Sequence, residues 1–117
     1  MNGTRIHVPT TRKQGEMLKD ERGHFVGFKD PNIVYIGRRF TRGGYDLPKS
    51  PWQNPYSVKR YGRKRAVALY REHILNSSPT LLSRLDELEG KILACWCTPG
   101  ELCHGDVLLE LLEARTE

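Results

Sequence analysis

Two short runs of apolar residues interrupt the otherwise polar chain. The run IVYIG spans residues 33–37, the run KILACWC spans residues 91–97, and turn-forming residues bound both of them. Short apolar runs between such residues are typical of buried strands. We therefore predict two buried strands, and shorter strands at RIHV (residues 5–8) and HFVGF (residues 24–28).

Apolar residues spaced three and four positions apart predict helices between and after the two apolar runs. One helix begins near Gly62, and a shorter one covers residues 81–90, with residues 77–80 capping its start. The last helix covers residues 104–114. The predicted buried positions are Ala66, Val67, Leu69, Tyr70 and Ile74 in the first helix and Val107, Leu108, Leu111 and Leu112 in the last.

The order of strand, helices, strand and helix predicts an α/β fold. A right-handed crossover would pair the two apolar strands in parallel, in a small, mostly parallel Rossmann-like sheet flanked by helices. The 117 residues fit a single domain, with residues 33–113 as its α/β core and residues 1–30 as an irregular N-terminal segment. Residues 37–56 lack periodicity and are rich in glycine and proline, so we expect a long loop there.

The placement of the cysteines and the absence of long apolar runs indicate the compartment. No run approaches the ~20 apolar residues that span a bilayer, and the N-terminus lacks the apolar stretch of a secretory signal. All three cysteines lie between positions 95 and 103, which makes a poor disulfide framework and suits a reducing compartment. We expect a soluble, cytoplasmic protein without a membrane partner, and the sequence leaves its oligomeric state open.

Basic charge is concentrated in the first two thirds of the chain. The formal net charge is +5, but residues 1–73 hold 16 Lys and Arg against 6 Asp and Glu, whereas residues 74–117 hold 3 against 8. Ten basic residues and one acid lie between Arg38 and Arg71. Such a surface attracts phosphates, whether of a nucleotide or of a nucleic-acid backbone. The alternative is a basic face that only keeps the protein in solution.

Residues able to hold a metal gather in the segment CWCTPGELCHGD, residues 95–106. Alternate residues of a strand share a face, so Cys95 and Cys97 point the same way. Three thiolates and one imidazole can form a tetrahedral zinc site. Zinc is therefore a candidate cofactor, with Cys95, Cys97, Cys103 and His104 as its ligands. The spacing differs from that of familiar zinc knuckles, which place two or more residues between paired cysteines.

Three other interpretations of this turn stay open. In one, Cys103 is a catalytic nucleophile at a helix N-terminus, with His104 or Asp106 as acid or base. In another, the turn binds a nucleotide without covalent chemistry, because loops that follow the carboxyl ends of parallel strands commonly bind anions. Cys97 would then contact the ligand, Gly105 would let it approach the backbone, and Asp106 could accept a hydrogen bond from a ribose hydroxyl. In the last, the cysteines are buried apolar groups and the polar side chains cap the helix.

Two arginines lie at the end of the first apolar strand. Gly37, Arg38 and Arg39 would meet the cysteine turn at one edge of the sheet if the strands are parallel. Arginine can hold a phosphate or carboxylate through two hydrogen bonds. We therefore predict that these residues bind the ligand, although a pair of solvated arginines is the simpler alternative.

The segment KSPWQNPY, residues 49–56, adds aromatic and amide groups. Such groups can stack on a base or form hydrogen bonds with its edge, and we assign Ser50, Trp52 and Asn54 to the ligand site on this basis. Equally, Trp52 could anchor the loop to the core.

Four motifs carry a resemblance to a known family. They are YIGRR, LPKSPWQNPYSV, YGRKRAVALYREHIL and LACWCTPGELCHGDVLLELL, between residues 33 and 112. Together they resemble the uncharacterised bacterial and phage family called domain of unknown function 4326, and the cysteine turn is similar, more weakly, to that of domain of unknown function 488. The resemblance implies a small Rossmann-like fold, frequently found in phages and mobile elements, and no established reaction. Gln53 departs from the glycine expected at its position.

Three classes of function follow from these patterns. The first is a domain that binds a nucleotide or nucleoside derivative, and processes or sequesters it in a phage or mobile-element context. If it is an enzyme, we expect a hydrolase or transferase acting at a glycosidic or phosphoryl centre. The second is a basic nucleic-acid-binding module whose Cys/His turn is fixed by zinc. The third is an interaction protein with a structural cysteine turn, in which Cys103→Ser and Asp106→Ala would leave ligand binding unchanged.

Overall fold

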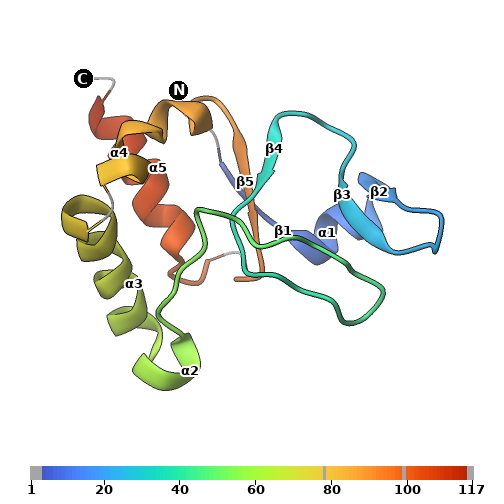
Figure 1. Ribbon diagram of the computed structural model, residues 1–117, viewed down its shortest axis with the longest axis horizontal. Coiled ribbons are helices and arrows are strands. Elements are labelled where there is room, and N and C mark those ends of the chain that lie inside the picture. The colour runs from blue at the N-terminus through green and yellow to red at the C-terminus, as the bar shows by residue number, and fades with distance from the viewer. Residues whose placement is uncertain (1–3, 78, 99, 116–117) are drawn as a thin grey trace.

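The centre of the protein is a three-stranded parallel sheet in the order β1, β5, β4 (Figure 1). The structure is a computed structural model that describes residues 4–77, 79–98 and 100–115. The two predicted apolar runs form β4 (Ile33–Tyr35) and β5 (Ile92–Cys95), and the run RIHV forms β1 (Arg5–His7). Because β4 and β5 pair in parallel, the prediction of an α/β fold with a mostly parallel sheet flanked by helices is confirmed.

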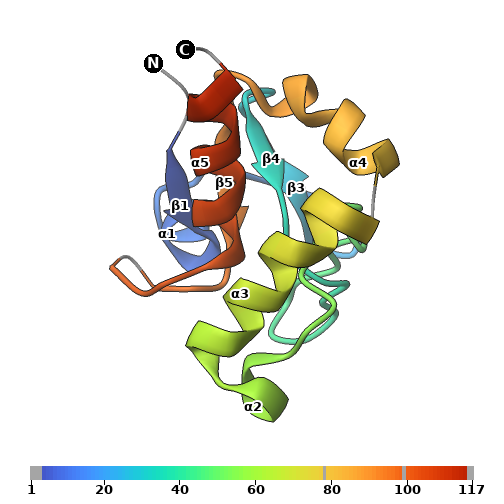
Figure 2. The same ribbon diagram turned by 90° about the vertical axis from the view of Figure 1, so that its left-hand side faces the viewer.

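Helices from the crossover between β4 and β5 cover one face of this sheet. They are α2 (Val58–Tyr61), α3 (Arg63–Glu72) with a π-helical continuation (His73–Ser77), α4 (Pro79–Ser83) and a 3-10 turn (Leu85–Leu88). The last helix, α5 (His104–Arg115), follows β5 and packs against α3 on the same face (Figure 2). None of the helices in the described ranges is long and apolar enough to cross a membrane.

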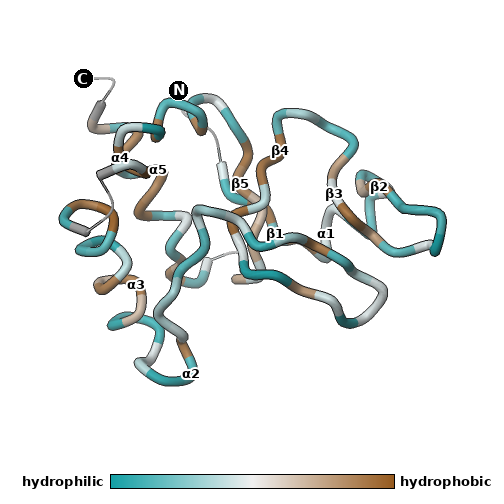
Figure 3. Tube along the Cα trace, viewed as in Figure 1, coloured by the Kyte–Doolittle hydropathy of each residue, from teal (hydrophilic) through white to brown (hydrophobic). Residues whose placement is uncertain are grey.

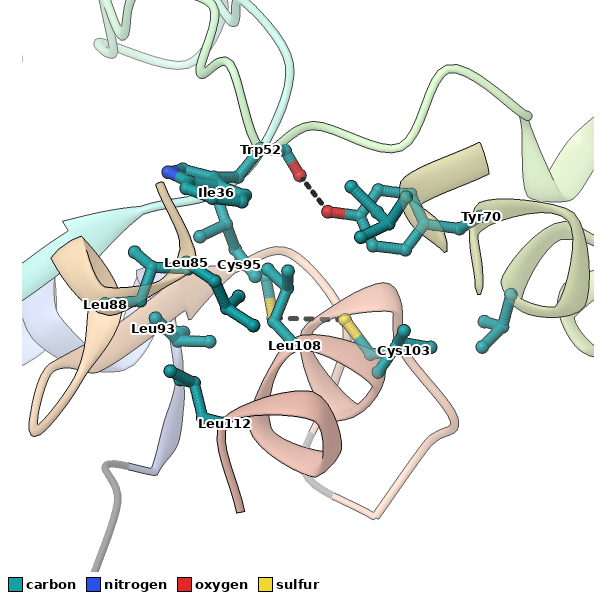
Figure 4. Close-up of a cluster of buried hydrophobic side chains, with 13 residues drawn as sticks. Ile36, Trp52, Tyr70, Leu85, Leu88, Leu93, Cys95, Cys103, Leu108 and Leu112 are labelled. Carbon is teal, nitrogen blue, oxygen red and sulfur yellow. Dashed lines mark hydrogen bonds between the residues drawn. The ribbon is translucent and has the colours of Figure 1, made fainter. Parts of the chain in front are cut away.

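Two hydrophobic clusters, one on each face of the sheet, hold the elements together. Alternation along β5 sends Leu93 and Cys95 into the cluster beneath α3 and α5, which Figure 4 shows, and Ala94 into the other cluster. The hydrophobic segments, brown in Figure 3, include β3 (Phe25–Phe28), β4 and α5. Since both faces of β5 are covered, its run of apolar residues is what a central parallel strand requires.

The prediction that residues 1–30 form an irregular segment is wrong for the part that the structure describes. β1 is an edge strand of the central sheet, and helix α1 (Val8–Lys13) follows it. β2 (Met17–Lys19) and β3 (Phe25–Phe28) form a second, antiparallel sheet, and β3 matches the predicted strand HFVGF. Elements this short give no measurable periodicity, although Val8 and Met17 are buried in the core.

The predicted helix near Gly62 is confirmed, but a separate short helix precedes it. Ser57 caps α2 by accepting a hydrogen bond from the backbone N–H of Arg60 at 3.1 Å. Gly62 then adopts a positive φ of 82°, which breaks the helix and redirects it into α3. The predicted cap at residues 77–80 includes Ser78, which lies outside the described residues. Residues 37–56 form the expected loop, with isolated bridges between Phe40 and Leu47 and between Tyr45 and Phe25.

Candidate functional site

A cleft of about 570 Å³ opens where the carboxyl ends of β4 and β5 meet the start of α5. The loop after β4 contributes Gly37, Arg38 and Arg39 to its lining, and the turn after β5 contributes Cys97, Cys103 and His104. The parallel pairing of β4 and β5 places these two segments at the same edge of the sheet. The structure thus brings together the arginine and cysteine segments that the sequence singled out.

The lining of this cleft is strongly basic. Five cationic side chains contribute to it and, among the described residues, no carboxylate does. These cations are Arg38, Arg39, Arg42, Lys59 and Arg63, and the aromatic residues of the lining are Phe40, Tyr56 and Trp96. The basic run in the sequence indicated a charged surface, but only the fold shows which of its members share one cleft. Such an arrangement attracts small anions.

The three cysteines form a compact cluster, two members of which, Cys97 and Cys103, line the cleft. Their sulfur atoms all lie within 4.8 Å of one another, so this group could hold a metal ion. The Sγ atoms of Cys95 and Cys103 are 3.5 Å apart (Figure 4). Cys95 and Cys103 are buried, whereas Cys97 is partly exposed.

Of the three thiols, that of Cys97 is the one whose pKa is lowered, whereas one interpretation of the sequence made Cys103 the reactive thiol. Hydrogen bonds from Cys103 and Cys95, with a further one from Arg63, hold the pKa of Cys97 well below its ordinary value. The pKa of Cys103 is raised, because its proton is shared with Cys95 and Cys97 and its side chain is buried. The sulfur of Cys103 accepts a hydrogen bond from the backbone N–H of Gly105 at 3.4 Å, at the N-terminus of α5. This bond lowers the pKa of Cys103, but the other causes outweigh it.

The imidazole of His104 is held by the backbone of Ile36, the residue that follows β4. Its Nε2 lies 2.7 Å from the carbonyl oxygen of Ile36. A carbonyl oxygen can only accept, so Nε2 carries the proton and Nδ1 keeps its lone pair, 3.7 Å from the sulfur of Cys103. Burial lowers the pKa of His104, which favours this neutral form. His104 therefore lines the cleft, and its Nε2 is already hydrogen-bonded to the backbone of Ile36.

Arg5 in β1 forms hydrogen bonds with the turn between β5 and α5, although the sequence did not single it out. Its guanidinium donates to the Sγ of Cys95 at 3.6 Å, the carbonyl oxygen of Cys97 at 3.4 Å and that of Glu101 at 2.7 Å. Its Nε donates to Asp106 at 3.2 Å. The side chain of Arg5 is only 12% exposed. A cationic residue within a predicted strand was the available signal, because such a side chain needs partners when the strand is buried.

Asp106 caps α5 and does not line the cleft. Its second carboxylate oxygen accepts the backbone N–H of Cys103 at 3.0 Å, three residues earlier, as the last member of a capping box does. Its other oxygen accepts a hydrogen bond from Arg5, so both carboxylate oxygens of Asp106 have partners within the protein. The capping alternative from the sequence fits this geometry, and the proposed contact with a ribose does not.

Two of the predicted ligand contacts lie in the core instead. Trp52 is 3% exposed, and its carbonyl oxygen accepts the hydroxyl of Tyr70 at 2.8 Å (Figure 4). Ser50 is also buried and its hydroxyl accepts the backbone N–H of Trp52. Trp52 therefore anchors the loop, the alternative that the sequence left open.

Asn54 and Gly105 serve packing more than ligand contact. Asn54 lines the cleft, but its amide donates to the carbonyl oxygen of Ala66 at 3.1 Å and accepts the N–H of Tyr56 at 2.9 Å. Gly105 is buried, and a Cβ there would lie 2.9 Å from Cδ1 of Ile36. Its missing side chain lets α5 approach β4, which leaves no room for a ligand at that point.

Comparisons with known proteins place the chain in a family without naming its activity. No solved structure matches it significantly. Uncharacterized protein R718 of Acanthamoeba polyphaga mimivirus is 40% identical over 86 residues, which cover 67% of this chain and 65% of that protein. The chain therefore spans a little under two thirds of the length of this relative. A family model matches residues 21–114, a range that begins before the expected residue 33 and includes β3 and the whole cleft lining. The chain belongs to the family described as Domain of unknown function (DUF4326), as its motifs predicted.

Proposed function

We propose that the protein binds a nucleotide or nucleoside derivative in the basic cleft. The observation that carries the proposal is the lining itself, in which five cationic side chains and no carboxylate lie beside aromatic rings, among the residues described. A volume of about 570 Å³ lies within the range of clefts that hold small ligands. Phosphate and base would thus meet complementary groups in one site.

The phosphate would be held by arginine side chains rather than by the start of α5. The capping carboxylate of Asp106 already accepts the N–H of Cys103, and the N–H of Gly105 points at the Cys103 sulfur. Arg39 is exposed and, within the described ranges, has no hydrogen-bond or ion-pair partner. It can therefore turn toward an anion without breaking an existing contact.

The base would pack against the aromatic part of the lining. Phe40 and Trp96 lie with their ring centroids 4.3 Å apart, and the indole N–H of Trp96 donates to the hydroxyl of Tyr35 at 2.7 Å. Tyr56 adds a third ring to the lining. Stacking of a base on such rings contributes about 1–3 kcal/mol per base.

We propose binding rather than hydrolysis or group transfer. The expected acid and base already have partners within the protein: both carboxylate oxygens of Asp106 accept hydrogen bonds, and Nε2 of His104 donates to the carbonyl oxygen of Ile36. This arrangement favours sequestration of the ligand over glycosidic or phosphoryl chemistry.

Calorimetric titration with adenosine 5′-monophosphate, adenosine 5′-diphosphate and inorganic phosphate tests the proposal. We expect Arg39→Ala to weaken nucleotide binding tenfold or more, because a charged hydrogen bond contributes about 1.5–3 kcal/mol. Lys29→Ala, which removes the same charge from an exposed position after β3, is the matched control and should leave the affinity unchanged. Absence of binding by every one of these ligands, or equal weakening by both substitutions, would contradict the proposal.

A nucleic-acid-binding module with a zinc-fixed turn is the second candidate. Two observations favour it: exposed Arg60, Lys64 and Arg65 extend the basic surface along α2 and α3, and the cysteine cluster could hold a metal. A module of this kind would bind a single-stranded oligonucleotide with steep salt dependence and would bind a mononucleotide poorly. Competition between a twelve-residue oligothymidylate and adenosine 5′-monophosphate separates the two candidates.

A further inference from the structure

The spacing of the three sulfur atoms suits a single metal ion. A tetrahedral zinc ion with Zn–S bonds of about 2.3 Å places its sulfur ligands about 3.8 Å apart. Cys95 and Cys103 lie 3.5 Å apart, and all three sulfurs lie within 4.8 Å of one another. Cys95 ends β5, Cys97 lies two residues beyond it, and Cys103 directly precedes α5, so the sulfurs come from the turn between these two elements. Small side-chain rotations would bring them to bonding geometry.

Each sulfur also accepts a hydrogen bond from a nitrogen. Arg5 donates to Cys95 at 3.6 Å and Arg63 donates to Cys97 at 3.4 Å. The backbone N–H of Gly105 donates to Cys103 at 3.4 Å. Groups that donate to ligand atoms in this way orient and stabilise metal-bound thiolates. The two guanidinium charges would also offset the net negative charge of one divalent ion with three thiolates.

The position of the cluster leaves one side of such an ion open. Cys97 and Cys103 line the cleft and Cys95 lies buried behind them. The fourth ligand expected from the sequence, His104, has its Nδ1 3.7 Å from the Cys103 sulfur, but it is not part of the group whose ligand atoms all lie within 4.8 Å of one another. Its Nε2 hydrogen bond to Ile36 restrains the ring from turning toward the other two sulfurs.

We infer that Cys95, Cys97 and Cys103 bind one zinc ion whose fourth coordination position opens into the basic cleft. Structural zinc sites use four protein ligands, whereas sites that engage a ligand keep a position for an exogenous atom. Water or a small anion would occupy this position. An oxygen of the bound nucleotide would also reach this open position. That statement rests on the function proposed above.

Cobalt(II) substitution tests the metal site directly. The full chain, stripped of metal under a phosphine reductant that keeps the thiols reduced, is titrated with Co²⁺ and then with Zn²⁺. We expect one Co²⁺ per chain, sulfur-to-cobalt charge-transfer absorption, and displacement by one equivalent of Zn²⁺. Absence of stoichiometric binding of both metals under reducing conditions would overturn the inference.

Substitutions separate metal ligation from mere packing. Cys97→Ser, at the partly exposed cysteine, should weaken zinc binding by more than the 10- to 100-fold typically lost with a supporting hydrogen bond. Arg63→Met should cost about 10- to 100-fold, and Arg65→Met, at an exposed position on the same helix, should change nothing. His104→Gln should leave the cobalt spectrum intact, and loss of an imidazole ligand from that spectrum would show a closed, four-ligand site instead.

Azide is the probe for the open position because it does not depend on nucleotide binding. Addition of azide to the cobalt protein should shift the visible absorption bands, and no shift at saturating azide would overturn the open position. Adenosine 5′-monophosphate should produce its own shift. If calorimetry detects no nucleotide binding while metal and azide behave as expected, the metal inference holds and the nucleotide proposal fails.

Discussion

At Gly105, a hydrogen atom in place of a methyl group lets α5 begin against β4 and β1. A Cβ there would lie 2.9 Å from Cδ1 of Ile36 and 3.1 Å from Cδ of Arg5. Ile36 is fully buried, and hydrogen bonds to the turn restrain Arg5, so neither can move away freely. We predict that Gly105→Ala lowers the free energy of unfolding by about 1–3 kcal/mol, measured by urea denaturation.

Gly27 in β3 provides the matched control for this substitution. A Cβ at Gly27 meets nothing within 4 Å, and its φ is not positive. Gly27→Ala should therefore change stability by no more than about 0.5 kcal/mol. Equal effects of the two substitutions would show that α5 does not depend on close approach at Gly105.

Single residues also show where sequence reasoning reached its limit. The side-chain chemistry of Cys97 and Arg38 placed them near a site, because both follow predicted strands whose carboxyl ends share an edge. The sequence could not decide whether Trp52 faces a ligand or the core, since both environments favour an aromatic ring. Nor could it find Arg5, whose partners lie about a hundred residues away in the chain.

At the scale of elements, predictability follows the pattern of apolar residues. β4 and β5 were predictable as runs of apolar residues, and α3 and α5 because their buried residues recur three and four positions apart. α1 and β2 span six and three residues, too few to establish a period, and their stability comes from packing on the sheet and the hairpin. The break between α2 and α3 at Gly62 was visible as a glycine, but not as a boundary between two helices.

The loop at residues 37–56 is joined to α3 by a buried hydrogen bond. Tyr70 is fully buried and its hydroxyl donates to the carbonyl oxygen of Trp52 at 2.8 Å. Burial raises the pKa of Tyr70, so the donor proton stays in place. Tyr70→Phe leaves that carbonyl without its partner, and we predict a loss of about 1–3 kcal/mol in the free energy of unfolding.

Tyr61→Phe is the control for this loop contact. Tyr61 ends α2, and its ring lies 5.9 Å from that of Tyr56 in a partly exposed environment. Removing its hydroxyl should change the free energy of unfolding, measured by chemical denaturation, by less than about 0.5 kcal/mol. If Tyr70→Phe proved equally mild, the loop would be held by the apolar packing of Trp52 alone.

At the scale of the whole molecule, the question is whether anion binding needs the cleft or only the net charge. Reversing Arg38 and Arg39 to glutamate, or reversing Lys13 and Lys29, lowers the formal charge of +5 by the same amount. Arg38 and Arg39 line the cleft, whereas Lys13 and Lys29 lie on the exposed surface of the N-terminal part. At 0.1 M salt, charges separated by more than about 10 Å are largely screened from one another.

We therefore predict that the two charge-reversed proteins differ sharply in nucleotide affinity. The Arg38/Arg39 variant should lose about a hundredfold or more, which corresponds to roughly 2.7 kcal/mol, because direct contacts become repulsive. The Lys13/Lys29 variant should lose less than about threefold at 0.1 M salt, and this small loss should vanish as salt is raised. Calorimetry at two salt concentrations measures both effects, with circular dichroism to verify that each variant is folded. Comparable losses in the two variants would mean that the protein attracts phosphates through its overall field, and the cleft would then have no special role in recognition.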